Sequence, residues 1–442
     1  MIEQLIKDSK DRRDKFNLRY KMYHDDYKKQ VELKLGQIYR AFVELKLDVQ
    51  INKNFNIFKR VINDISGAYT SKPTREFTNE EFKDMYSIGR VNKYMKRCEQ
   101  YVNAFNDILL QVDYDEEKGK PKLIIRTPDK FVVEMDDNDN IVSIAYIVGL
   151  TDSSTIRWAY WSEKEHYYID ETNGETNKVT IEGNEEKVNP YGILPFVVMQ
   201  NGVRDYGFFD TTTGDDLADG TIDAAVHLTF LNHIIKSQSF KQLIGKGDNL
   251  QQLEGQVLDP LTILTLSGQN TDIDVLDLQS NYEQLWKTIN DMASNLSIGY
   301  GVSPSQFTLS GDAQSGFALQ LQNIKRDTKV IESQDDFTYY ERELFEVLKV
   351  VSGKEGDMTI DFPPITYPMS TQEKLDSISK GIDLALTSPQ EELMKEDANL
   401  SEEEADTIVK DNIAKRNTLL VKTEQSSVNV ATTAAALGVS QQ

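Results

Sequence analysis

The chain has 442 residues, and its 72 Asp and Glu against 49 Lys and Arg give a formal net charge of −23. Hydrophobic residues make up 39% of the sequence, which is enough for a core and argues against general disorder. The single cysteine, Cys98, excludes an internal disulfide and any metal site built from several cysteines. The acidic balance argues against a protein that reads DNA sequence, because such proteins carry a basic surface that displaces the counterions of phosphate.

Neither a membrane span nor a secretory signal is expected. No window approaches the roughly 18 uncharged apolar residues of a spanning helix, and the first residues are too charged for a signal peptide. The length predicts two to four domains or one large interrupted domain. The missing signal peptide and the single cysteine together indicate a protein made and used in a reducing cytoplasm, or in a particle assembled there.

The N-terminal third is predicted to be mainly helical. Residues 1–35 carry both charge signs and are expected to form a solvated helix that docks on something else. Helical spacing of Phe55, Phe58, Ile62 and Ile65 predicts a helix over 54–70. Further helix is expected over 80–112, and Leu45, Val49 and Ile51 resemble a strand.

From residue 122 the period changes to that of strands. About 70 residues alternate like an antiparallel meander, with turns indicated by Asn173-Gly174 and Gly183-Asn184. An apolar strand within 191–202 is expected to close this meander.

Three long helices dominate the remainder. An amphipathic helix is predicted over 214–240, a second over 281–298 and a third over 317–351. Short strands are expected within 241–280, and a loop rich in small residues over 299–316. An apolar strand pair from 358 to 368 and helices over 370–387 and 389–416 follow. The order of elements predicts an α+β fold with a helical hairpin inserted between its parts.

Sequence signals of catalysis are missing. There is no GxxxxGK followed by Ser or Thr, which disfavours a P-loop ATPase. His227 and His233 lie six residues apart, about 240° around a helix axis, and form no metal motif. The acidic run 391–406 does not follow the spacing of a calcium loop, so a solvated helix face is the better interpretation. We therefore expect no enzyme activity, no catalytic residue, no cofactor and no metal.

Five segments occur in an order that resembles the portal proteins of tailed double-stranded-DNA bacteriophages. A helix that ends before a proline, 62–73, precedes a strand–acidic turn–strand segment, 127–148, and a strand with an internal proline, 191–202. The helix 214–240 and the loop-to-helix segment 301–321 are similar to the start of the portal stem and to the entry of its long helix. The resemblance covers roughly residues 40–415, and neither residues 1–35 nor the last 25 residues match anything in it.

This resemblance implies a phage portal-like architecture with an α/β wing, a two-helix stem, a small α/β clip, a long wing helix and a helical crown. The implied regions are, in chain order, the wing at 1–213, the first stem helix at 214–240, the clip at 241–280, the second stem helix at 281–298, the tunnel loop at 299–316, the long helix and closing wing strands at 317–368, and the crown with the C-terminal tail at 369–442.

It also implies a function and partners. Portals are homo-oligomeric rings, usually of twelve subunits, at one capsid vertex of the virion. Double-stranded DNA passes through the ring during packaging and ejection, without sequence readout. The expected partners are the terminase motor, a head-tail adaptor at the clip, and the capsid and scaffolding proteins, with no membrane. The expected location is the virion, after assembly in the host cytoplasm.

Three sets of residues are the predicted functional sites. The tunnel loop would face DNA through Gln306, Phe307, Thr308, Leu309 and Asp312. Near the stem–clip junction, Lys236, Lys241 and Lys246 would approach DNA, although capping of helix ends explains these lysines equally well. The subunit interface of the stem would pair Leu228, Leu231 and Ile235 with Leu285, Ile289 and Met292.

Two other functions stay open from the sequence. One is an enzyme of the packaging system, such as a terminase subunit, which the missing P-loop disfavours. The other is a scaffold or adaptor that binds proteins and forms no channel. A closed ring many times the mass of the 50.4 kDa subunit would favour the portal.

Overall fold

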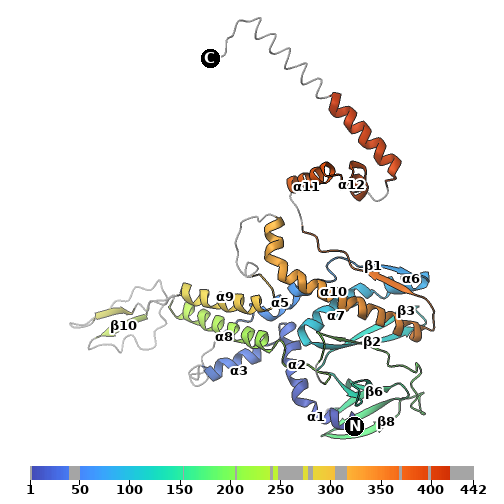
Figure 1. Cartoon of the computed structure of the whole chain (residues 1–442). Coiled ribbons are helices and arrows are strands. Elements are labelled where there is room, and N and C mark those ends of the chain that lie inside the picture. Colours follow the sequence, from blue (N-terminus) through green and yellow to red (C-terminus); the bar gives the residue numbers. More distant parts are fainter. Residues whose placement is uncertain are drawn as a thin grey trace. The chain divides into compact units, whose positions relative to one another are not determined.

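A computed structural model gives the arrangement of the chain (Figure 1). It describes residues 2–38, 50–152, 154–204, 207–238, 242–246, 272–276, 282–303, 316–367, 371–396 and 400–418. Two compact units are present, one comprising Met1–Asp312 and Leu321–Ile365, the other Ala313–Gln320 and Thr366–Gln442. Helices and sheets are mixed in the first unit, which confirms the predicted α+β class.

The N-terminal segment is built into the body of its own chain. It forms three helices, α1 (Ile2–Asp8), α2 (Lys10–Tyr23) and α3 (Lys28–Ile38). Ile6, Phe16 and Tyr27 are fully buried among residues of this chain. The expectation of one solvated helix is therefore wrong, because widely spaced apolar residues between the charges face the chain's own core. The surface on which this segment docks is the body of the same chain.

The next helices follow the predicted pattern only to residue 105. Helix α5 (Ile57–Ile65) is capped by the Asn56 side chain, and α6 (Glu80–Ile88) and α7 (Val91–Phe105) follow. Asn106 then adopts φ 66° and ends α7. Residues 107–112, expected in a helix, instead begin β2 (Asp107–Asp115). Of the strand-like residues 45, 49 and 51, the first two lie outside the described residues, and Ile51 is in no strand.

Two sheets form most of the β structure. The smaller has the order β3-β2-β9, with β3 at Lys120–Arg126 and β9 at Phe196–Gln200. The predicted strand after Pro195 therefore exists, but it pairs with β2 and does not close the meander. The meander itself is confirmed from β4 onward as a five-stranded sheet in sequential order, with β4 (Phe131–Met135), β5 (Ile141–Leu150), β6 (Thr155–Ser162), β7 (His166–Thr172) and β8 (Glu175–Val179). Residues 122–126, expected to begin it, belong instead to β3 of the smaller sheet.

The meander is covered on both faces. Val132, Trp158 and Ile169 pack with Ile2 and Ile6 of α1 on one face. Phe131, Val133, Ile144 and Trp161 on the other face pack with Phe196 of β9 and with Phe208 in one hydrophobic cluster. Asn173 and Gly174, with φ 52° and 84°, form the predicted turn between β7 and β8.

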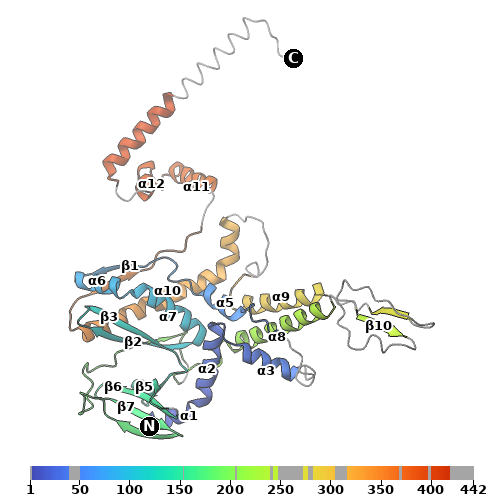
Figure 2. The same cartoon turned by 180° about the vertical axis from the view of Figure 1, so that it is seen from behind.

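The three long helices are present close to their predicted bounds, as α8 (Asp215–Gln238), α9 (Tyr282–Gly299) and α10 (Gly316–Ser352). Helices α8 and α9 lie side by side in both views (Figures 1 and 2). Between them in sequence, β10 (Gln242–Lys246) pairs antiparallel with β11 (Asp272–Leu276).

The segment after α10 does not form the predicted strand pair. Strand β12 (Met358–Asp361) pairs antiparallel with β1 (Thr74–Phe77), which lies far away in the sequence. In the second unit, α11 (Thr371–Asp383) and α12 (Pro389–Glu396) precede a helix at 402–418. The helix expected over 389–416 is therefore represented by two described helices.

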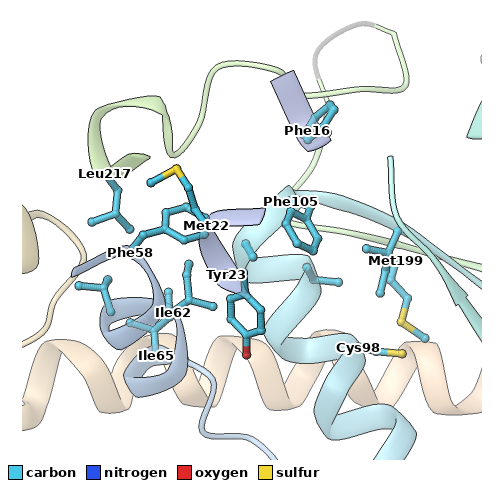
Figure 3. Close-up of a cluster of buried hydrophobic side chains, with 14 of the residues drawn as sticks. Phe16, Met22, Tyr23, Phe58, Ile62, Ile65, Cys98, Phe105, Met199 and Leu217 are labelled. Atoms are coloured by element: carbon cyan, nitrogen blue, oxygen red, sulfur yellow. The ribbon is translucent and has the colours of Figure 1, made fainter. Parts of the chain in front are cut away.

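The main hydrophobic core joins the N-terminal helices to α7, β9 and the start of α8. Figure 3 draws Phe16, Tyr23, Phe58, Phe105 and Leu217 among its members. Burial of each such side chain contributes about 1.5–3 kcal/mol relative to exposure. Cys98 is fully buried in this core, and burial raises the pKa of its thiol, so it behaves as a small apolar residue.

Candidate functional site: the paired helices and the polar network at their base

Helix α8 is fixed to the body by two threonines on one face. The hydroxyl of Thr221 accepts the backbone N–H of Phe58 at 2.9 Å, and that of Thr229 accepts the N–H of Asn52 at 3.0 Å. Each hydroxyl also donates to a carbonyl one turn earlier in α8. Since the N–H of Phe58 lies in the first turn of α5 and has no partner within that helix, Thr221 completes the capping of α5.

The contact between α8 and α9 is apolar and close. Ile289 and Ala293 of α9 are buried in the same core as Leu217, Ile222 and Val226 of α8. At Gly220, an added Cβ would lie 2.5 Å from Cδ1 of Leu296. The small residue therefore lets the two helices approach closely at their base.

Two cations meet the N-terminus of α8. Asp215, its first residue, pairs with Lys15 at 2.5 Å and with Arg19 at 2.8 Å, both on α2. Burial by itself would raise the pKa of Asp215, but the hydrogen bonds from Lys15 and Arg19 hold it below its ordinary value. The carboxylate thus stays ionised, which also suits the positive end of the helix dipole.

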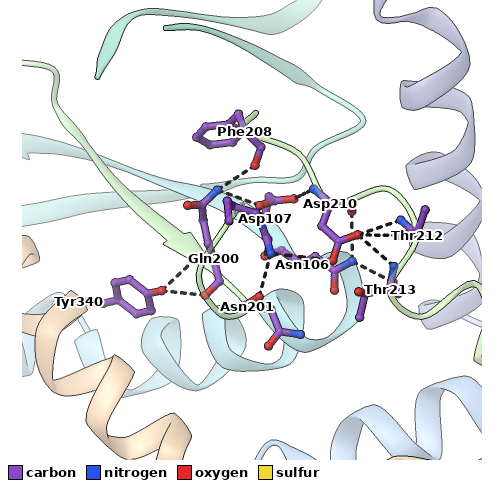
Figure 4. Close-up of polar contacts among 10 residues, drawn as sticks. Asn106, Asp107, Gln200, Asn201, Phe208, Asp210, Thr212, Thr213 and Tyr340 are labelled. Atoms are coloured by element: carbon purple, nitrogen blue, oxygen red, sulfur yellow. Dashed lines mark hydrogen bonds and ion pairs between the residues drawn. The ribbon is translucent and has the colours of Figure 1, made fainter. Parts of the chain in front are cut away.

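A buried polar network holds the loop that leads into α8 (Figure 4). The side-chain amide of Asn106 donates to the carbonyls of Asp210 and Thr213, at 3.1 and 2.8 Å. The carboxylate of Asp210 accepts the backbone N–H groups of Thr212 and Thr213. Burial opposes the charge of Asp210, yet these bonds keep its pKa well below the ordinary value.

Asp107 lies at the centre of this network and is completely buried. It accepts bonds from Arg204 at 2.6 Å, from Gln200 at 3.0 Å and from the N–H of Asp210 at 2.9 Å. Burial raises the pKa of Asp107, and the Arg204 guanidinium and the hydrogen bonds oppose that shift. The hydroxyl of Tyr340 donates to the carbonyl of Gln200 at 2.8 Å and so adds α10 to the network.

The six residues predicted for the stem interface separate into two groups. Leu228, Leu231 and Ile289 are buried within this single chain, where α3 and α5 also pack on α8. Ile235 and Leu285 are exposed, at 41% and 37%, and Met292 is half-buried. The buried three belong to the subunit's own core, so only the exposed members present a surface to another molecule.

Most of the residues predicted to face DNA lie outside the described residues. This holds for Gln306, Phe307, Thr308, Leu309 and Asp312 of the loop and for Lys241. Lys236 lies in the last turn of α8, and Lys246 is the last residue of β10, opposite Asp272 of β11.

Sequence reasoning did not find the network of Asn106, Asp107 and Arg204. Asn106 and Asp107 stand at a helix-to-strand junction, and an asparagine there signals a left-handed residue. Their partners lie about one hundred positions further along the chain, and a single sequence has no signal for that pairing.

Other site types are not found in the part of the chain that the structure describes. There, no group of three or more His, Cys, Asp or Glu side chains is arranged to hold a metal ion. No described helix combines the length and the apolar character needed to cross a membrane.

Solved structures and one family model are similar to this chain. Among solved structures, a chain in the virion of a native gene transfer agent particle has a TM-score of 0.48 and 10% identity, covering 77% of this chain and 89% of that one. A chain in the neck of the native particle, computed with C12 symmetry, has a TM-score of 0.45 and 11% identity, covering 80% and 92%. No curated protein matches.

The family described as "Phage portal protein, SPP1 Gp6-like" matches residues 2–416. The match begins at Ile2, the first residue of α1, so the expectation that residues 1–35 lie outside the family resemblance is wrong. It runs through both sheets, the three long helices and most of the described second unit. The chain therefore belongs to the SPP1 Gp6-like family of phage portal proteins.

Proposed function

We propose that this chain forms a ring-shaped portal at one vertex of a capsid, with a channel through which double-stranded DNA is packaged and ejected. The observation that carries the proposal is the family match over residues 2–416, nearly the whole chain. A portal is a structural conduit, and the proposal assigns the chain no enzymatic step. Its place is the virion, after assembly of the ring in the host cytoplasm.

The regions follow from the resemblance. We assign residues 1–213 and 317–368 to the wing, with α10 as its long helix. Helices α8 and α9 are the stem, and the segment 241–280, which contains β10 and β11, is the clip. The loop at 299–316 is the tunnel loop, and residues 369–442 form the crown and tail. The close apolar contact of α8 with α9 supports a stiff hairpin that can line a tube.

Charge supports passage of DNA without tight binding. The chain carries a formal net charge of −23, and Asp216 and Asp219 are exposed on α8. An acidic wall repels phosphate and keeps the polymer from adhering, while a few basic residues supply local contacts. Lys236, Lys241 and Lys246, with the tunnel loop, remain our candidates for those contacts.

The proposed partners are those of a portal ring. They are further copies of the same chain, twelve in the usual ring, the terminase motor, a head-tail adaptor at the clip, and capsid and scaffolding proteins. Contacts around the ring are heterologous, since each subunit offers one face to the next and the opposite face to the previous one.

Electron microscopy of the purified chain tests the ring. We expect class averages with rotational symmetry and a central hole, and a mass many times the 50.4 kDa of the subunit. A monomer, or a compact oligomer without a hole, would instead favour an adaptor or another packaging component.

Substitution of two leucines distinguishes a residue at the contact between subunits from a residue in the core of one subunit. Leu285→Asp changes an exposed residue of α9, so we expect loss of rings with little change in the unfolding of the subunit. Leu231→Asp places a charge in the chain's own core and should lower the free energy of unfolding by about 3 kcal/mol or more. Sizing and denaturant titration measure both effects.

Val203→Asp is the matched control, because Val203 is 98% exposed and lies outside both helices. It should form rings of normal stability. Normal rings in the Leu285→Asp variant would remove Leu285 from the proposed contact between subunits.

A further inference from the structure

The two edges of the five-stranded meander differ in character. Strand β8, at one edge, exposes Glu175, Asn177 and Lys178, and such polar and charged side chains discourage pairing with another strand. Strand β4, at the other edge, is apolar, with Phe131, Val132 and Val133 buried. Of the two edges, β8 therefore carries the polar and charged side chains that usually prevent another strand from pairing, and β4 does not.

Part of the β4 edge has backbone groups available for pairing. The carbonyl of Lys130 accepts the N–H of Ile147 at 2.8 Å, so the alternation of an antiparallel pair directs residues 130, 132 and 134 toward β5. The backbone N–H and C=O groups of Phe131 and Val133 then point away from β5, toward the edge of the sheet. Arg12 donates to the carbonyl of Phe131 at 2.9 Å, so this carbonyl already has a hydrogen-bond partner. Val133 is left facing the open edge.

A groove of about 480 Å³ runs along this edge. One wall is α1, with Leu5 and Asp8, and the other is formed by Phe208 and Phe209. The Arg12 guanidinium lies 3.6 Å from the centroid of the Phe209 ring and fixes the end of that wall. Burial, followed by the charge of Arg13, lowers the pKa of Arg12 to about 10, so it remains a cation at neutral pH.

The two walls have different chemistry. Val132 packs with α1 and Val133 with Phe208, so alternate residues of β4 face opposite walls. Glu134 shares the face of Val132 and therefore lies on the side of Asp8. Among the described residues, neither Glu134 nor Asp8 forms an ion pair with a lysine or arginine. One wall is thus acidic and the other aromatic.

We propose that the β4 edge and this groove bind an extended peptide segment of a partner protein, which adds to the meander as a sixth strand. Backbone hydrogen bonds to Val133 would hold the strand, and alternate side chains would reach the two walls. The charges select a segment in which lysine or arginine, facing Asp8 and Glu134, alternates with apolar residues that face Phe208 and Phe209. The five residues of β4 allow a contact of roughly 17 Å.

The probe is an acetylated and amidated six-residue peptide of alternating lysine and valine, titrated against the full-length chain. We expect saturable binding. Two analogues carry N-methyl groups either on the valines or on the lysines, and only one set of N–H groups can face β4. One analogue should therefore bind at least tenfold more weakly and the other nearly as well as the parent peptide.

Variants of the chain test the acidic wall. Asp8→Lys should weaken peptide binding roughly fivefold or more, because it reverses a charge beside the peptide lysines. Asp11→Lys makes the same charge change at an exposed position outside the groove and should leave binding unchanged.

Several results would overturn the proposal. They are absence of binding up to millimolar peptide, equal binding of both N-methyl analogues, and equal effects of the two aspartate substitutions. A change in oligomeric state on Asp8→Lys with unaltered peptide binding would also overturn it, since the groove would then be a contact between copies. Peptide binding is measured whether or not the parent chain forms rings, and the ring itself is judged from micrographs of the parent chain, so failure of the proposed portal function is distinguishable from failure of this proposal.

Discussion

Glu341→Leu should lower the free energy of unfolding by about 3–5 kcal/mol. Glu341 of α10 is completely buried and holds a buried cation, Arg75 of β1, through bonds of 2.5 and 3.0 Å. The Tyr69 hydroxyl donates to the same carboxylate at 2.8 Å. In the native chain, burial acts to lower the pKa of Arg75, and the hydrogen bond and charge of Glu341 outweigh burial and raise it. An arginine keeps its charge at neutral pH even without such a partner, so the substitution leaves a buried guanidinium without its carboxylate. Denaturant titration measures the loss.

A double substitution separates the charge from the packing. Arg75→Met combined with Glu341→Leu removes both members of the pair and should recover most of the loss, because no buried charge is left uncompensated. Glu346→Leu on the same helix is the control. Its carboxylate is 63% exposed and pairs with Lys349, so we expect a change within about 0.5 kcal/mol. A double variant as unstable as Glu341→Leu alone would assign the effect to packing and not to the charge.

The sequence predicts the long helices of this fold better than its strands. Helices α8, α9 and α10 were predictable because apolar residues recur at helical spacing over many turns. The start of β2 was not predictable. Residues 107–112 are buried without interruption, and such a run shows neither the helical period of about 3.6 residues nor the alternation of a half-buried strand. The partner of β9 depends on β2, so this error also placed β9 in the wrong sheet.

Periodicity identifies an apolar helix face but not the element that covers it. Leu228 and Leu231 were predicted to meet a neighbouring subunit, whereas α3 and α9 of the same chain pack on α8. The apolar residues of α3 stand between many charges, so their spacing alone did not indicate a buried helix. For the same reason the sequence could indicate the portal resemblance without locating the polar network around Asp107.

Stability should also fall as the pH rises, because of one buried carboxyl group. Glu99 of α7 is completely buried. Its Oε1 accepts the N–H of Ala68 at 2.8 Å and the hydroxyl of Ser333 at 3.2 Å, while Oε2 has no hydrogen-bond partner among the described residues. Burial raises the pKa of Glu99 from 4.5 to about 7, and the hydrogen bonds only partly oppose this shift.

The fall in stability with rising pH follows from the different protonation of Glu99 in the folded and the unfolded chain. Above pH 4.5 the unfolded chain releases the Glu99 proton, whereas the folded chain keeps it until the pH passes about 7. The unfolded state is therefore favoured progressively between these values, and the effect levels off above pH 7. From pH 5.5 to 8 the contribution of Glu99 to the free energy of unfolding should fall by about 2 kcal/mol.

Glu99→Gln removes the titrating group and retains an oxygen that can accept from Ala68 and Ser333. Urea titrations between pH 5.5 and 8 should give this variant a flatter stability profile than the parent chain, and a higher stability than the parent at pH 8. Glu117→Gln, at an exposed position in the turn after β2, should keep the profile of the parent. If Glu99→Gln loses stability equally at every pH, the side chain acts through its hydrogen bonds alone, and its proton has no part in folding.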